Sequence, residues 1–299
     1  MKYVALVTGA SGYTGMHLCK ALLENGWMVH AVVRESSDTE RLRKLTSDRV
    51  VIHVYDDVAD NLLDIFRISC PDVVYHLAAM VSSANDYDVI QPMLSSNIIF
   101  GTKVIEAMLQ VGCKKLVNTS TSWVHYDQSQ YSPVCLYAAS KMAFVDIIKF
   151  YQDAYGLEVI TLELCDSFGG DDHRKKLLNL IRDSVRSGKK LATTQGMQKI
   201  SLLYIDDLID GFIVSGNHLM ENNNVYGCYI LPAKEIMTLR ELVDRIENIC
   251  KVKVNISWGK LPYRPREVMS PWDKGMVLPG WRQNISLDDG IRMFMGCKQ

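Results

Sequence analysis

The sequence predicts an α/β fold, with a doubly wound parallel sheet followed by a smaller C-terminal lobe. Short apolar runs rich in Val, Ile and Leu alternate with amphipathic stretches across the first half of the 299-residue chain. Continuous apolar runs are typical of strands buried on both faces, as in parallel sheets. A glycine-rich turn follows the first run, and strand–helix alternation of this length indicates βαβ units.

The predicted elements of the first half follow in strict alternation. Strands are expected over 3–8, 28–33, 50–55, 73–77, 115–119 and 159–164, and helices over 17–24, 39–46, 61–68, 96–111 and 138–155. Later the pattern loosens, with helices expected over 175–187 and 239–250 and a return to the sheet near 201–205. The alternation therefore ends near residue 165, and a second lobe begins there.

Composition excludes several classes of function. Hydrophobic residues make up 48% of the chain and the formal net charge is −1, so we expect no nucleic-acid partner and no anionic membrane surface. The cluster Arg174-Lys175-Lys176 remains a candidate phosphate site. The N-terminal run lacks the form of a signal peptide, and no window approaches ~18 uninterrupted apolar residues. These features favour a cytoplasmic protein without a membrane partner.

Cysteine spacing predicts no metal site. None of the eight cysteines forms a CxxC pair, which makes zinc or thiol-redox chemistry unsupported. Most of them have apolar neighbours and are interpreted as small buried hydrophobic residues of a protein in a reducing compartment. They are Cys19, Cys70, Cys113, Cys135, Cys165, Cys228, Cys250 and Cys297.

The glycine-rich turn at 8–15 joins the first strand to the following helix. Gly9, Gly12 and Gly15 are three residues apart. Such glycines permit a tight turn and close approach of a pyrophosphate, which the helix N-terminus then binds. The turn predicts a dinucleotide-binding, Rossmann-type domain over residues 1–165, with a return of the chain around 200–218. Residues 166–299 would mainly form a substrate-binding lobe.

The end of the second predicted strand bears on the choice of cofactor. An enzyme that uses NAD places Asp or Glu there to hold the ribose 2′-hydroxyl. This chain has Arg34 instead, followed by Glu35 and two serines. An arginine accommodates a 2′-phosphate, which favours NADP(H) over NAD(H). The alternatives are that Arg34 is merely solvated or that Glu35 holds the ribose.

Tyr137 and Lys141 are four residues apart on a predicted helix and therefore share a face. A lysine ammonium near a tyrosine hydroxyl lowers the pKa of the phenol, and such a tyrosine can pass a proton to or from a sugar hydroxyl. The fifth strand ends in the hydroxyl run Thr119-Ser120-Thr121-Ser122. A doubly wound sheet delivers strand ends to the cofactor crevice, so these features together indicate a catalytic site.

Together these motifs resemble the extended short-chain dehydrogenase/reductases, in their NAD-dependent epimerase/dehydratase branch. The resemblance covers nearly the whole chain and its motifs occur in order. They are TGxxGxxG at 8–15, HLAA at 76–79, NxxGT at 97–102, the strand-end TSS at 119–121, YxxxK at 137–141, VDD at 205–207, RPGD/E at 264–267, LGW at 278–281 and SLEEG at 286–290.

The resemblance implies a role for individual residues. Thr121, Tyr137 and Lys141 would be catalytic. The cofactor would be bound by Gly9, Gly12, Tyr13, Thr14, Gly15, Arg34, Asp57, Val58, Leu77, Ala78, Ala79, Thr119, Tyr137, Lys141 and Cys165. The substrate would be bound by Thr121, Ser122, Asp166 and Arg264, and Arg264 matches the arginine that grips the nucleotide diphosphate.

Some positions depart from the family pattern. His125-Tyr126 stands where the family often has Tyr-Gly, Glu163 replaces a usual arginine, and Asp166 replaces an asparagine that faces the substrate in many members. The departures concern the sugar and the reaction subtype rather than the fold.

The resemblance also bears on the reaction. A 4,6-dehydratase needs an acidic pair directly after the catalytic threonine, whereas Ser122 and Trp123 follow Thr121 here. Arg34 favours a net reductase that draws on NADPH. The chain is most similar to the branch that reduces the C4 keto group of nucleotide-linked 4-keto-6-deoxysugars. The alternatives are a nucleotide-sugar 4-epimerase with tightly held NAD and a non-catalytic NADP-sensing protein of the same fold.

The predicted helices 96–111 and 138–155 each carry two apolar faces. One face would pack on the sheet and the other must be covered. In the family that the chain resembles, such a pair forms a four-helix dimer interface, so we expect a homodimer. The alternative is that loops or the second lobe cover these faces within one chain.

Overall fold

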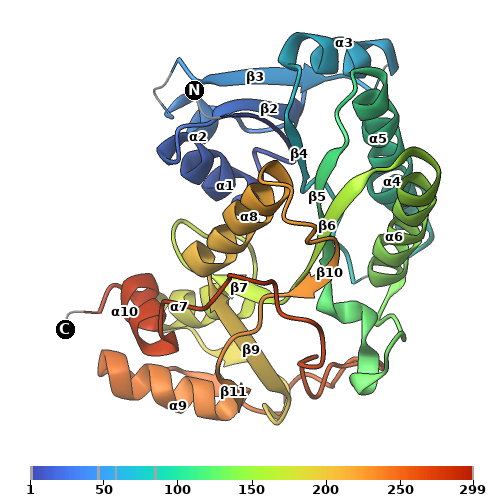
Figure 1. Ribbon diagram of the computed structural model, residues 1–299. Helices are drawn as coiled ribbons and strands as arrows, with labels where there is room; N and C mark the ends of the chain where they lie inside the picture. The colour runs from blue at the N-terminus through green and yellow to red at the C-terminus, as the bar shows by residue number, and fades with distance from the viewer. Residues whose placement is uncertain (1–2, 46–47, 58, 84–85, 298–299) are drawn as a thin grey trace.

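A seven-stranded parallel sheet forms the centre of the computed structural model, which describes residues 3–45, 48–57, 59–83 and 86–297. The strand order is β10-β6-β5-β4-β1-β2-β3, and Figure 1 shows the sheet edge-on among its helices. The strands are β1 (Val4–Thr8), β2 (Met28–Arg34), β3 (Val50–Tyr55), β4 (Val73–His76), β5 (Lys115–Thr121), β6 (Glu158–Leu164) and β10 (Gly227–Ile230). The predicted doubly wound fold is confirmed.

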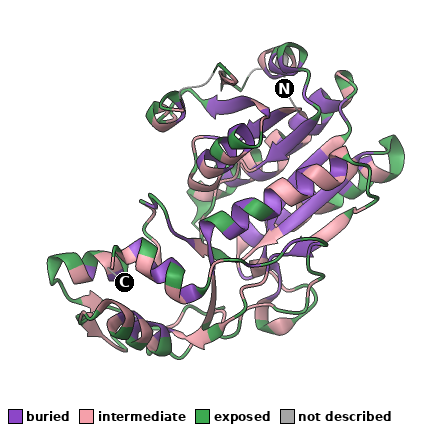
Figure 2. Cartoon of the chain, turned by 60° about the vertical axis from the view of Figure 1, so that its left-hand side comes forward, coloured by how far each residue is buried: buried purple, intermediate pink, exposed green. Residues whose placement is uncertain are grey.

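Helices cover both faces of this sheet. Along β1, Ala5 and Val7 enter one apolar core and Leu6 enters the other, which is why the strand sequence is apolar throughout. The first core includes α1 (Tyr13–Glu24) and α8 (Ile205–Met220). The second includes α3 (Ala59–Ser69), α5 (Phe100–Gln110) and α6 (Leu136–Tyr155). Figure 2 shows the buried residues gathered on the sheet and on the inner sides of these helices.

This half also contains shorter helical pieces, among them two 3-10 turns over Ser122–Val124 and Tyr126–Gln128. The others are α2 (Glu40–Arg43), α4 (Tyr87–Leu94) and a π-helical turn over Ser95–Ile99 that leads directly into α5. The predicted helix over 96–111 is thus the second part of a longer helical stretch. The strand order reverses direction between β1 and β4. In doubly wound sheets the ligand crevice opens at such a reversal, beyond the carboxyl ends of the strands.

The second lobe is built from short strands and three helices. A three-stranded sheet contains β7 (Asp166–Phe168), β9 (Lys199–Tyr204) and β11 (Ile236–Thr238), and a two-stranded sheet contains β8 (Leu191–Ala192) and β12 (Ile256–Ser257). The helices are α7 (Leu177–Ser187), α9 (Leu239–Cys250) and α10 (Leu287–Met295). Figure 1 places this lobe below the carboxyl ends of the central strands.

The prediction that residues 201–205 return to the main sheet is wrong. The apolar run there forms β9, which pairs with β7 and β11 in the small sheet instead. The chain returns through α8, which packs on α1 and the sheet, and then through β10, which pairs with β6. The composition of a short apolar strand does not predict which strand it pairs with, because strand pairing is a long-range contact.

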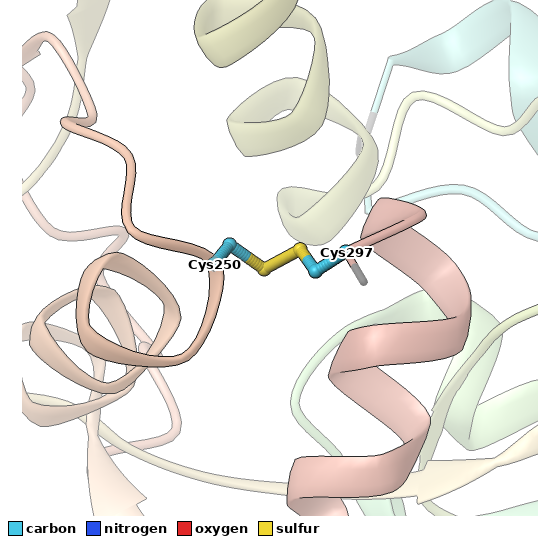
Figure 3. The surroundings of a disulfide bond; sticks show 2 residues. All are labelled: Cys250 and Cys297. Atoms are coloured by element: carbon cyan, nitrogen blue, oxygen red, sulfur yellow. A yellow bond between two sulfur atoms is a disulfide. The ribbon is translucent and has the colours of Figure 1, made fainter. Parts of the chain in front are cut away.

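Two cysteines form a disulfide, which the cysteine spacing did not predict. Cys250 ends α9 and Cys297 follows α10, and their Cα atoms are 5.3 Å apart (Figure 3). The bond links residues 47 positions apart, where two packed helices end side by side. Cys19 and Cys113 are buried as expected, whereas Cys70 is exposed. Among the described helices, none is both long and apolar enough to cross a membrane.

Candidate active site

A cleft of about 250 Å³ lies where β5 and β6 end and the second lobe begins. Its lining combines hydroxyl, aromatic and charged side chains from both halves of the chain. The lining residues are Thr14, Leu77, Ala79, Val81, Thr119, Ser120, Thr121, Ser122, Trp123, Tyr137, Leu164, Cys165, Asp166, Ser167, Arg174 and Lys176. The structure thus brings together much of the predicted site. In the described part of the chain, no three His, Cys, Asp or Glu side chains are grouped as metal ligands.

The glycine turn lies beside this cleft. Gly9 has a φ of +68°, and its carbonyl accepts a hydrogen bond of 3.0 Å from the N–H of Gly12. A Cβ on Gly9 would lie 2.7 Å from the backbone nitrogen of Ala78, and one on Gly15 would overlap the carbonyl of Gly9. Glycine is therefore required for the turn to pack against β4 and to start α1. The start of α1 reaches the cleft through Thr14, so the arrangement fits a dinucleotide pyrophosphate.

Lys141 lies buried behind the cleft, with only 1% of its surface exposed. Its Nζ donates to Thr119 Oγ1 at 3.4 Å, and Thr119 Oγ1 donates to the carbonyl of His76 at 3.1 Å. Burial lowers the pKa of Lys141 to about 8. Burial, together with the Lys141 charge, lowers the pKa of His76 to about 3. At neutral pH this network therefore carries one positive charge, on the lysine.

Tyr137 lines the cleft from the first turn of α6 and is 9% exposed. Its carbonyl accepts from Ser140 Oγ at 2.7 Å, and Ser140 Oγ accepts from Asn97 Nδ2 at 3.0 Å. Burial raises the pKa of Tyr137 to about 12, with a smaller contribution from Cys135. The predicted lowering of this pKa by Lys141 is therefore wrong: burial raises the pKa, and the Lys141 ammonium is bonded to Thr119 instead.

Thr121 ends β5 at the cleft and is 7% exposed. Its Oγ1 accepts a hydrogen bond of 3.3 Å from the backbone N–H of Trp123, which leaves the hydroxyl proton to donate elsewhere. The Trp123 ring meets Tyr137 edge-on, with 6.4 Å between the ring centroids. A neutral phenol and a hydroxyl thus border the same small space, as proton donation to a substrate oxygen requires.

Two cations lie over the Trp123 ring at the cleft. Lys176 Nζ is 5.9 Å from the ring centroid and 3.3 Å from Asp166 Oδ1. The Arg264 guanidinium is 5.4 Å from the same centroid and makes two 3.0 Å hydrogen bonds to the carboxylate of Glu267. Charge-assisted bonds of this kind suit phosphate oxygens as well as carboxylates. These groups can therefore hold an anionic part of a ligand.

The residues predicted near the adenosine lie outside the cleft lining. Arg34 ends β2, is exposed, and is held by a turn in which Ser37 Oγ accepts from its backbone N–H at 3.1 Å. Asp57 accepts from Tyr55 Oη at 2.8 Å and from Lys103 Nζ at 3.2 Å, and these bonds lower its pKa. Val58 lies outside the described residues.

Two departures from the family pattern contact each other. His125 Nε2 lies 3.2 Å from Glu163 Oε2, and His125 Nδ1 donates to the carbonyl of Gln130 at 2.7 Å. The imidazole stacks on Trp272 with 4.0 Å between centroids and 13° between planes. Burial lowers the pKa of His125, but the hydrogen bond and charge of Glu163 outweigh it, so the pKa is raised. The two residues that depart from the family pattern, His125 and Glu163, thus form an ion pair with each other.

Sequence reasoning assigned no binding role to Trp123 and Ser167, and it considered Arg174 only as part of the basic cluster at 174–176, a candidate phosphate site. Trp123 was noted only because it occupies a position where a 4,6-dehydratase has an acidic residue. Arg174 and Lys176 were noted as members of a basic cluster. They are two residues apart, and this spacing is the signal that could have predicted that both side chains line the cleft. An extended segment turns every second side chain to the same side.

The chain is similar in sequence to proteins that carry the names of nucleotide-sugar enzymes. The chain is 28% identical to a CDP-abequose synthase of Yersinia pseudotuberculosis in an alignment of 272 residues that covers 89% of this chain and 90% of that protein. It is 25% identical to a UDP-glucose 4-epimerase of Mycolicibacterium smegmatis, over 71% and 72% of the two chains.

A similar fold is found among solved structures. The UDP-glucuronic acid 4-epimerase of Bacillus cereus, in complex with UDP-glucuronic acid and NAD, superposes with a TM-score of 0.85 at 23% identity and covers 98% of both chains. The model of the NAD dependent epimerase/dehydratase family matches residues 5–227, which is most of the chain. The protein therefore belongs to the NAD-dependent epimerase/dehydratase family.

Proposed function

We propose that the protein reduces the C4 keto group of a nucleotide-linked 4-keto-6-deoxysugar, with NADPH as the reductant. One observation carries this proposal: the Tyr137 phenol, the Thr121 hydroxyl and Thr14 at the start of α1 line the same cleft. A phenol that stays protonated at neutral pH is a proton donor. Relatives named CDP-abequose synthase support a nucleotide-linked sugar as the substrate.

The chain's own residues would supply everything except the hydride, which NADPH delivers to C4 when bound. Tyr137 gives its proton to the C4 oxygen, which leaves an alcohol on the sugar and a phenolate that water reprotonates. Thr121 donates a hydrogen bond to the same oxygen from the end of β5. Lys141, whose ammonium donates to Thr119 Oγ1 behind the cleft, would help to hold the nicotinamide ribose. The C4 carbonyl would thus gain one hydride, which NADPH would supply on oxidation to NADP⁺, and one proton, which Tyr137 would supply.

The two lobes would divide the binding. We propose that residues 1–165, with α8 and β10, hold the cofactor, and that Arg34 pairs with its 2′-phosphate. Residues 166–299 would mainly hold the sugar nucleotide, with Arg264 and Lys176 exchanging their carboxylate partners for phosphate oxygens at the Trp123 ring. Asp166 and Ser122 would face the sugar from the cleft lining.

A 4-epimerase is the second candidate, because relatives with that name also match and Glu35 stands next to Arg34. The deciding experiment incubates the purified protein with NADPH and a panel of nucleotide 4-ketosugars and follows the nicotinamide absorbance. We expect consumption of NADPH in step with the alcohol formed. Interconversion of 4-epimers without net loss of NADPH would indicate the epimerase. NADPH binding with no turnover of any nucleotide sugar would indicate an NADP-sensing protein.

We also propose a homodimer formed through α5 and α6. Ile99, just before α5, is 53% exposed, and Phe150 on α6 is 56% exposed. Such side chains would be covered by the same helices of a second copy. Light scattering at micromolar protein concentration should give twice the 33.8 kDa mass of the chain. A monomeric mass that does not change with concentration would overturn the dimer.

A further inference from the structure

The basic cluster at 174–176 splits between the cleft and the solvent. Arg174 and Lys176 are half-buried and line the cleft, whereas Lys175 is exposed. Lys176 lies over Trp123, but Arg174 lies elsewhere: its guanidinium carbon is 3.9 Å from the centroid of the Tyr13 ring. Tyr13 is the first residue of α1, at the end of the glycine turn. The two cations therefore serve different parts of the cleft.

The segment between β7 and α7 crosses the start of α1. Tyr13 Oη donates to the carbonyl of Gly169 at 2.8 Å, although the two residues are 156 positions apart. A Cβ on Gly170 would come within 2.7 Å of the His17 ring, so this segment packs closely on α1. The same segment also contacts α2, where Arg41 Nη2 is 3.4 Å from Asp171 Oδ2. The second lobe thus reaches across to the glycine turn.

Arg174 is held in one orientation by a buried carboxylate. Its Nε donates to Asp172 Oδ1 and its Nη2 to Asp172 Oδ2, each at 2.8 Å, and Asp172 is 1% exposed. Nη2 also donates to the carbonyl of Ser167 at 3.0 Å. None of the described residues accepts a hydrogen bond from Nη1. The guanidinium is therefore preorganised, with its remaining donors available on the side away from Asp172.

We propose that Arg174 binds the pyrophosphate of the dinucleotide cofactor and closes over the glycine turn from the second lobe. The proposal rests on the cofactor part of the proposed function. A pyrophosphate in this fold sits at the N-terminus of the first helix. Arg174 stacks on the first residue of that helix and lines the cleft together with Thr14. Lys176 and Arg264, at Trp123, remain for the sugar nucleotide.

The proposal separates two cationic contacts with the same cofactor. Arg34 would touch the 2′-phosphate, which only NADPH carries. Arg174 would touch the pyrophosphate, which NADPH and NADH share. Loss of Arg174 must therefore weaken both cofactors by a similar factor, whereas loss of Arg34 must change the preference between them. Asp172 would be a positioning residue, since it holds the guanidinium without reaching the ligand.

The test measures binding without turnover. NADPH and NADH are titrated into the protein in the absence of any sugar nucleotide, with nicotinamide fluorescence as the readout. We expect Arg174→Gln to weaken both roughly 10- to 100-fold, as for loss of a charge-assisted hydrogen bond. Lys175→Gln is the matched control, because it removes the same charge from the exposed neighbour, and it should change neither affinity by more than about twofold.

Arg174→Gln leaves Asp172 buried without its partner, which can destabilise the fold. The double variant Arg174→Gln/Asp172→Asn removes the charged pair together and should lose the same affinity, while circular dichroism reports whether either variant is folded. Calorimetric titration with CDP and UDP forms the second arm, and the Arg174 variants should bind these as the wild type does.

Three results would overturn the proposal. The first is wild-type affinity for both cofactors in the folded double variant. The second is a loss confined to NADPH, which would place Arg174 at the 2′-phosphate. The third is weakened CDP or UDP binding with unchanged cofactor binding, which would assign Arg174 to the sugar nucleotide. Because no sugar is turned over, a failed reductase assay leaves this test intact.

Discussion

The strand ends of the central sheet and the cationic edge of the second lobe hold their side chains in opposite ways. Thr121, Tyr137 and Lys141 are at most 9% exposed, and burial shifts the pKa of both Tyr137 and Lys141. Lys176 and Arg264 are nearly half exposed, and each is paired with a carboxylate. Burial thus sets the chemistry of the first group, whereas exchangeable ion pairs hold the second group ready for an anion.

The difference has an energetic cause. A buried ammonium such as that of Lys141 lowers stability, because its charged form loses solvation without an opposing charge. Ion pairs on a half-exposed surface are worth at most about 1 kcal/mol and can be broken cheaply when a ligand arrives. Changes at the strand ends should therefore alter rate and stability, and changes at the lobe should alter affinity.

The largest effect is expected from Tyr137→Phe. The change keeps the ring and its packing but removes the proton that Tyr137 donates. General acid–base groups contribute roughly 10²–10⁴-fold, so kcat should fall by about that factor while NADPH affinity stays nearly unchanged. Thr121→Val should cost less, since it removes one hydrogen bond. Steady-state assays with fluorescence titration check both, and Tyr131→Phe, at an exposed tyrosine, is the control. Near-wild-type turnover of Tyr137→Phe would show that another acid serves.

The next effect is on cofactor choice, at an exposed position of the first half. Arg34→Asp should weaken NADPH binding by roughly 1.5–3 kcal/mol, because it removes a charge-assisted contact with the 2′-phosphate. NADH affinity should stay the same or rise. Glu35→Gln, the adjacent acidic residue, should alter the preference little. If the wild type already binds NADH as tightly as NADPH, the role of Arg34 is wrong.

Lys141→Met tests whether the buried charge lowers stability. The pKa of Lys141 is about 8 in the fold against 10.5 ordinarily, so the folded state binds fewer protons than the unfolded state between these values. The free energy of unfolding of the wild type should therefore rise from about pH 8 to 10.5. At pH 7 the methionine variant should be inactive yet more stable by roughly 1–3 kcal/mol.

Denaturant unfolding across this pH range measures the Lys141 effect. The advantage of the variant should shrink as the pH rises, because the wild-type lysine becomes neutral. Lys149→Met, at a lysine whose side chain is 68% exposed, should stay within about 0.5 kcal/mol of the wild type throughout. A Lys141→Met protein that is less stable at pH 7 would mean that the ammonium stabilises the site.

The smallest effect is expected at the pair His125 and Glu163. The raised pKa of His125 means that the pair stabilises the fold fully below about pH 6.5 and loses this contribution as the pH rises through the folded pKa. Glu163→Gln should therefore lower the free energy of unfolding by about 1 kcal/mol at pH 6 and by less at pH 9. Glu158→Gln is the control, because it breaks an ion pair with Lys115 rather than with a histidine. Parallel curves for the wild type and Glu163→Gln would contradict the coupling.

Local patterns in the sequence were enough to predict the central fold and which strand and helix ends meet at the cleft. The apolar runs of β1, β2 and β5, the glycine spacing at 9–15 and the four-residue spacing of Tyr137 and Lys141 all act over a turn or a strand. Such patterns predict which face of a strand or helix a residue occupies. A doubly wound sheet then brings the ends of its strands to one edge. For this reason Thr14, Thr121 and Tyr137 line the same cleft as expected.

Contacts between distant residues were decided only by the tertiary structure. The sequence carries no local signal that Cys250 meets Cys297, that His125 meets Glu163, or that Arg174 stacks on Tyr13. The pKa of Tyr137 is a further case, because the helical spacing predicts a nearby lysine but not the depth of burial. Periodicity reports which side of an element faces inward, whereas desolvation and pairing depend on what the rest of the chain places there.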